Sequence, residues 1–154
     1  MKTKIAFCAL AVVALAVSAC DDRRGGARVD RALCADFKTA KAAPLPTGGD
    51  GAASVDDCTR RWAYTLAPSH DDADIVAEAV ASACSAQLSR WNQQSLAQPA
   101  ADGEPTSILT GEPTSPIAEH NTFMRTRAMF YVVQARAGRC PGPKIVNGAP
   151  EGVS

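Results

Sequence analysis

Apolar positions recur at helical spacing in four stretches of this chain, and residues that begin or end helices flank each stretch. In the first stretch, Val29, Leu33 and Phe37 lie four residues apart and therefore share one face of a helix. Pro44 disfavours helical backbone at the residue before it, so we expect this helix to fade by residue 42 or 43.

The second stretch predicts a helix that begins after Ser54, a suitable N-cap, and ends before Pro68. Its apolar face comprises Val55, Cys58, Trp62 and Leu66. Two ion pairs at i,i+4 spacing are expected on the outer side: Asp56–Arg60 and Asp57–Arg61.

The third stretch predicts one long helix from Asp71 to about Leu96, stopped by Pro99. Aspartates in its first turn favour the helix dipole. One broad apolar face contains Ile75, Val76, Ala79, Val80, Ala83, Cys84, Leu88 and Trp91. The short link at Ser69-His70 predicts an antiparallel hairpin with the second helix.

The fourth stretch begins at Ser115-Pro116, a typical helix start, and Gly138 is placed to end it. Residues 129–133 also have high strand propensity. We favour a helix because the periodic stretch is long and the sequence offers no partner strand. The preceding loop, about residues 98–115, holds Gly-Glu-Pro-Thr-Ser twice, which indicates a local duplication.

The segment before these stretches has the pattern of a secretory signal. Lys2 and Lys4 precede an uncharged run from residue 5 to residue 19, and small residues close it. The run is too short to span a bilayer comfortably. We therefore expect residues 1–19 to be a cleaved signal peptide.

The end of this signal, Val17-Ser18-Ala19-Cys20, resembles the lipobox of bacterial lipoproteins. The resemblance implies a diacylglycerol group on the Cys20 sulfur, cleavage before Cys20 and a further acyl chain on the new amino terminus. It also implies a chain anchored in the cell envelope and facing the periplasm, on either the inner or the outer membrane. Ordinary secretion of a soluble protein is the alternative, because the same residues form a small-x-small cleavage site.

Four cysteines remain after the leader and the lipidated residue are set aside: Cys34, Cys58, Cys84 and Cys140. In an exported protein they predict two disulfides, with three connectivities. The helical hairpin brings Cys58 within one turn of Cys84, which favours Cys58–Cys84 with Cys34–Cys140, worth roughly 3.5 and 4.7 kcal/mol by loop closure. Cys34–Cys58 with Cys84–Cys140 stays open.

Composition sets the remaining limits. Loss of Lys2 and Lys4 leaves 14 basic and 16 acidic side chains, a net charge of −2, which argues against nucleic-acid binding. We expect an all-α, four-helix domain at 29–140, a flexible lipidated tether at 20–28 and a disordered tail at 141–154.

The residues that could act in catalysis or bind a metal or cofactor form no pattern that indicates an activity. Ser69-His70-Asp71 is contiguous, whereas a hydrolase triad converges from separate segments. Ligand spacings for a metal and signatures for a cofactor are absent, so neither is expected. We expect a non-enzymatic protein that binds another envelope protein or envelope component, with Arg60, Arg61 and Tyr64 as an exposed contact patch. The alternative is a small envelope hydrolase using His70 or His120 with a carboxylate.

Overall fold

The computed structural model describes residues 29–37, 50–98, 106–107 and 110–153. Four helices make up most of this part: α2 (Gly51–Leu66), α3 (Ala73–Ala83), α4 (Ser85–Leu96) and α5 (Pro116–Gly138). A two-stranded antiparallel hairpin follows, β1 (Ile145–Val146) with β2 (Ala149–Pro150). The expected all-α, disulfide-braced fold is confirmed in part: the described chain is mostly helical and carries two disulfides, but it also contains this small sheet. The expected signal peptide, Cys20 and the expected tether lie outside the described residues.

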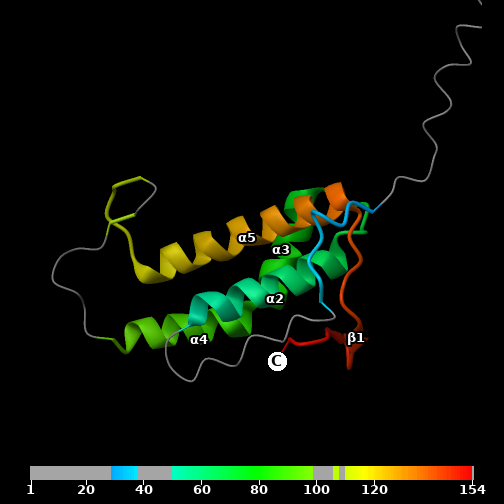
Figure 1. Ribbon diagram of the computed structural model, residues 1–154. Helices are drawn as coiled ribbons and strands as arrows, with labels where there is room; N and C mark the ends of the chain where they lie inside the picture. Colours follow the sequence, from blue (N-terminus) through cyan, green and yellow to red (C-terminus); the bar gives the residue numbers. More distant parts are fainter. Residues whose placement is uncertain (1–28, 38–49, 99–105, 108–109, 154) are drawn as a thin grey trace, which may run out of the picture.

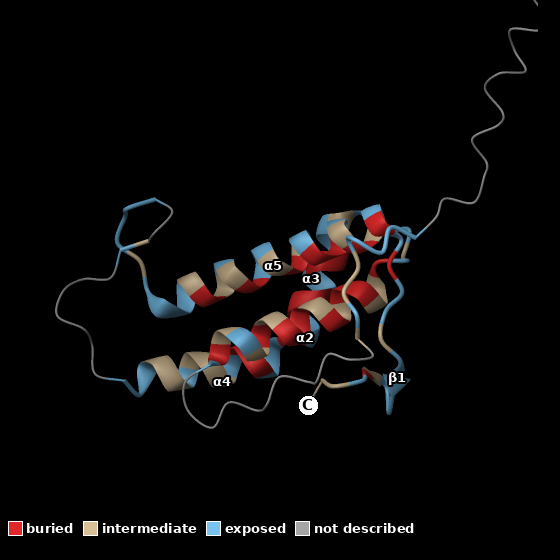
Figure 2. Ribbon diagram, viewed as in Figure 1, coloured by how far each residue is buried: buried red, intermediate tan, exposed pale blue. Residues whose placement is uncertain are grey.

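Helices α2 and α5 form the central pair, and α3 and α4 each pack against both of them (Figure 1). Buried residues, red in Figure 2, lie where these helices face one another. One apolar cluster fills the space between α3 and the carboxyl-terminal halves of α2 and α5. A second cluster joins α4 to their opposite halves, and Trp62 contacts both clusters.

Both expected disulfides are present. Cys58–Cys84 joins α2 to the junction of α3 and α4, with the Cα atoms 5.9 Å apart. Cys34–Cys140 joins the amino-terminal segment to the end of α5, with the Cα atoms 5.3 Å apart. A Cβ atom at Gly138 would lie 2.6 Å from the Cys140 sulfur, so Gly138 lets this disulfide lie against the helix end. The residue in the left-handed conformation is Arg139, not Gly138.

The expected single helix from 71 to 96 is wrong, because the helix is interrupted at Cys84. Cys84 has φ −101° and ψ 13°, outside helical values, although its N–H still donates to the Val80 carbonyl at 3.1 Å. The disulfide to Cys58 holds this residue against α2. Beyond this interruption, α4 packs onto the first halves of α2 and α5.

The predicted helix at 29–42 is also wrong within its described part. Residues 29–37 form turns, and residues 38–42 lie outside the described residues. The segment is held from outside: the Asp30 N–H donates to the Gly138 carbonyl at 2.9 Å, and the Tyr64 hydroxyl contacts both Leu33 and Ala35. Two turns of apolar spacing are too short to support a helix alone.

Helix α2 begins earlier than expected. Asp50 caps it by accepting a hydrogen bond from the Ala53 N–H at 3.2 Å, and Ser54 lies one turn inside. A Cβ atom at Gly51 would lie 2.2 Å from Cδ1 of Trp91, so glycine at this position lets the indole of α4 lie against the start of α2.

The predicted disorder of the tail is wrong for the residues that form the hairpin. Asn147 and Gly148 have φ +52° and +82°, the conformation of a type I′ turn between paired strands. Pro150 of β2 is buried against the body of the protein. The tail therefore covers part of α2. The expected helix across 129–133 is confirmed, since α5 runs through it.

Candidate functional site

The expected contact patch on α2 does not exist as an exposed surface. Arg61 is 2% exposed and Tyr64 is 1% exposed, whereas the Arg60 side chain keeps 31% of its surface. Tyr64 is covered by the segment at 33–37: its hydroxyl donates to the Leu33 carbonyl at 3.3 Å, and the Phe37 ring lies edge-on with centroids 5.1 Å apart. The expected contact patch of Arg60, Arg61 and Tyr64 must therefore be corrected, because Arg61 and Tyr64 are interior residues.

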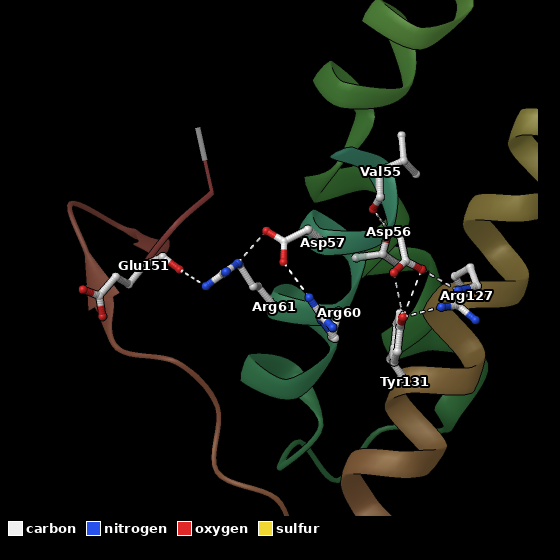
Figure 3. Close-up of polar contacts among 9 residues, drawn as sticks. Val55, Asp56, Asp57, Arg60, Arg61, Arg127, Tyr131 and Glu151 are labelled. Atoms are coloured by element: carbon white, nitrogen blue, oxygen red, sulfur yellow. Dashed lines mark hydrogen bonds and ion pairs between the residues drawn. The ribbon is translucent and has the colours of Figure 1, made fainter. Parts of the chain in front are cut away.

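Arg61 belongs to a buried ion-pair network centred on Asp57. Asp57 accepts hydrogen bonds from Arg61 Nε at 2.7 Å and from Arg60 Nη2 at 2.8 Å (Figure 3). On its other side, Arg61 Nη1 donates to the Glu151 carbonyl at 2.6 Å. The network thus fixes the tail hairpin onto α2. Its geometry is that of a structural brace.

A second network links α2 to α5. Asp56 accepts from the Tyr131 hydroxyl at 2.9 Å and pairs with Arg127 Nε, while Arg127 Nη2 donates to the same hydroxyl at 2.5 Å (Figure 3). Burial, together with the hydrogen bond to Asp56, raises the pKa of Tyr131 to about 12. The hydrogen bond to Asp56 raises the pKa of Arg127. The phenol therefore stays protonated at neutral pH and serves as a donor, not as a base.

The two candidate histidines occupy different environments. His70 is exposed in the turn between α2 and α3. His120 on α5 is 8% exposed, and its ring stacks on Trp91 of α4 with centroids 3.5 Å apart. The Nδ1 atom of His120 lies 2.7 Å from the amide oxygen of Asn92, which is not a carboxylate.

Hollows and histidines do not coincide. A hollow of about 420 Å³ lies between the segment at 35–37, the segment at 141–144 and Glu151, and another of about 350 Å³ lies between the ends of α2 and α5. Neither hollow is lined by His70 or His120. Among the residues that the structure describes, neither histidine faces a carboxylate in either of these hollows, so the geometry does not favour the hydrolase alternative.

Burial of His120 has a consequence for stability against pH. Burial lowers the pKa of His120, and the neighbouring Glu119 carboxylate opposes this only in part. The folded protein favours neutral His120, so the stability that this residue contributes is complete above its pKa in the unfolded chain, about 6.5. This contribution is lost as the pH falls through the lower pKa of His120 in the folded protein. We expect the free energy of unfolding to fall between pH 7.5 and pH 5.5.

His120→Gln should flatten this fall, whereas His70→Gln, the exposed control, should leave it unchanged. Denaturant titrations of the three proteins at several pH values measure the difference. An equally steep fall in His120→Gln would assign the pH dependence to other groups.

Within the described part of the chain, no group of three or more His, Cys, Asp or Glu side chains is placed to hold a metal ion. None of the helices described is both long and apolar enough to cross a bilayer. Comparison of the chain with protein-family models, with curated proteins and with solved structures gave no match.

Proposed function

We propose that the protein is a lipid-anchored protein of a bacterial cell envelope that binds an envelope component without catalysing a reaction. The observation that supports the lipid anchor is the leader sequence, which ends in Val17-Ser18-Ala19-Cys20. Acylation at Cys20 with more than one chain gives stable attachment to a membrane, because a single chain binds only marginally. The domain then faces the periplasm.

The disulfides support an extracytoplasmic location. Cys34–Cys140 and Cys58–Cys84 use all four cysteines that follow Cys20. Disulfides of this kind persist in the periplasm and are rare in the reducing cytosol. They also brace a core in which alanine is frequent and large apolar side chains are few.

Binding is favoured over catalysis by the environment of the polar side chains. The two arginine–aspartate networks join elements of the fold to one another, and His120 is held by an amide and an indole. Because these side chains are engaged in contacts within the fold, we assign the binding function to exposed surface residues. No contact among the described residues specifically favours a catalytic function.

The experiment is the intact mass of the protein extracted from membranes, alkylated before and after reduction. We expect a mass that begins at Cys20 and carries acyl groups, with four alkylations that appear only after reduction. Cys20→Ala should abolish the acyl mass, and Cys8→Ala, a matched change inside the leader, should leave it. A mature mass without acyl groups would contradict the anchor, and thiols that react before reduction would contradict the disulfides.

A further inference from the structure

One narrow strip along the exposed side of α5, from Thr122 to Ala137, carries no charged side chain over about four helical turns. Five exposed residues spaced four, four, three and four positions apart share this side: Thr122, Thr126, Phe130, Val133 and Ala137. Phe130 and Val133 are each 51% exposed. We call these five residues the α5 crest. A surface helix ordinarily turns charged residues to water, so the crest is suited to an apolar environment.

Arginines border the crest on both sides. On the α3 side, Arg125 pairs with Glu78 at 3.2 Å, and both side chains are more than half exposed. On the α2 side, Arg127 pairs with Asp56, and its guanidinium carbon lies 5.6 Å from the centroid of the Phe130 ring. An apolar strip with basic residues along its edges is typical of a helix that lies in a membrane interface.

Arg136 adds positive charge at the carboxyl-terminal end of α5. It donates to three backbone carbonyls around the α2–α3 turn, those of Ala67, Ser69 and Asp71, at 2.7–3.0 Å. All three acceptors are neutral carbonyls, so these hydrogen bonds bring no carboxylate against the charge of Arg136. An anionic headgroup is a suitable counter-charge.

The route of the chain places the crest near the lipid. The described residues begin beside the end of α5, where Asp30 bonds to Gly138 and Cys34 is joined to Cys140 (Figure 1). Nine residue steps separate Cys20 from Val29, which reach at most about 30 Å. The carboxyl-terminal end of α5 therefore stays within about 30 Å of a bilayer that holds Cys20.

From these observations, we propose that the α5 crest lies against the bilayer in which the chain is anchored, with Phe130 and Val133 at the acyl boundary and Arg125, Arg127 and Arg136 at the level of anionic headgroups. The proposal deepens the proposed function and rests on it: the envelope component that is bound is the phospholipid surface itself. Binding of this kind orients the domain on the membrane, so that the opposite side of the molecule faces the periplasm.

Another exposed apolar residue supplies the contrast. Ile75 on α3 is 60% exposed, more than Phe130 or Val133 of the crest. It lies near acidic residues, with Asp74 directly before it and Asp72 one turn before it. Anionic lipid repels this surface, so Ile75 should face water when the crest faces lipid.

The test uses the full chain, purified from membranes and reconstituted into vesicles that contain anionic phospholipid with brominated acyl chains, which quench tryptophan. Val133→Trp places a reporter on the crest and Ile75→Trp places one on α3. The emission of Trp62 and Trp91 is subtracted with the unsubstituted protein. We expect quenching of roughly half or more of the added emission for Val133→Trp and roughly a tenth or less for Ile75→Trp.

Equal quenching of the two reporters, or none in Val133→Trp, would overturn the proposal. Thr126→Trp provides a second reporter on the crest if Val133→Trp does not reproduce the circular dichroism of the parent. Phe130→Asp added to Val133→Trp should reduce the quenching at least twofold, because a carboxylate then faces the acyl boundary. Unchanged quenching in this double variant would also contradict the proposal.

The intact mass of the same sample separates this proposal from the anchor. Acylated protein with an unquenched crest reporter would overturn the membrane contact and leave the anchor standing. Protein without acyl groups whose crest reporter is still quenched would support the membrane contact and contradict the anchor.

Discussion

Asp57→Ala is expected to lower the free energy of unfolding by about 3–5 kcal/mol, because it removes the counter-charge of a buried cation. Arg61 is 2% exposed and is held by Asp57 at 2.7 Å. The Asp57 side chain is 9% exposed, so water does not replace it. Denaturant unfolding measured by circular dichroism gives the loss, and an unchanged m-value shows that the unfolded ensemble is the same.

Two variants separate charge burial from simple loss of contacts. Arg60→Ala removes the outer arginine, whose side chain is 31% exposed, and should cost about 1 kcal/mol or less. Asp57→Leu combined with Arg61→Met removes both buried charges and should recover most of the stability lost by Asp57→Ala. A loss below about 1 kcal/mol for Asp57→Ala would show that the pair is solvated.

This ion pair also shows the limit of sequence reasoning about surfaces. The spacing of Asp57 and Arg61 predicted their contact correctly, but it also placed the pair on the outer side of α2. The covering elements come from far along the chain: residues 33–37 lie over Tyr64, and Glu151 lies over Arg61. A helical wheel of α2 holds no information on such distant segments, so the predicted patch was wrong.

Helix existence was predictable where local signals agreed. Ser115 and Pro116 mark the start of α5, and the Ser115 hydroxyl accepts from the Ala118 N–H at 3.2 Å as a cap should. The interruption at Cys84 was not predictable from periodicity, because the apolar spacing continues through it. Its cause is the tertiary link to Cys58.

The sequence contains a specific turn signal for the tail hairpin. Asn147-Gly148 is the dipeptide that type I′ turns require, and it lies between Ile145-Val146 and Ala149-Pro150. The glycine and proline content of 141–154 is typical of a disordered tail. The turn signal was the more specific of the two, since it accounts for the positive φ at both positions.

The crest of α5 was equally open to sequence reading. Met124, Ala128, Tyr131 and Ala135 recur at helical spacing, and the structure buries all four. Phe130 and Val133 lie on the other side of the helix, in an uncharged strip between arginines, and both are exposed. Exposed apolar residues outside the buried face indicate a second apolar environment, and the proposed lipid anchor would bring a bilayer within reach.

Loss of either disulfide should cost several kcal/mol, but through different parts of the molecule. Cys34→Ala with Cys140→Ala opens a loop of 106 residues, and Cys58→Ala with Cys84→Ala opens one of 26. Loop-closure entropy gives losses of about 4.7 and 3.5 kcal/mol. Cys58 and Cys84 are 3% and 0% exposed, so their replacement by alanine also leaves a cavity. This added cost brings the two losses of stability closer together.

Hydrogen exchange distinguishes the two links. Without Cys34–Cys140, the segment at 33–37 is held mainly by Tyr64, so protection of the Ala35 N–H, which donates to that hydroxyl at 3.2 Å, should fall before global unfolding. Without Cys58–Cys84, protection should fall instead at the α3–α4 junction, at the Leu88 N–H that donates to Cys84. Loss of protection at the same sites in both variants would mean that the two disulfides brace one cooperative unit, and local opening at either end would then be excluded.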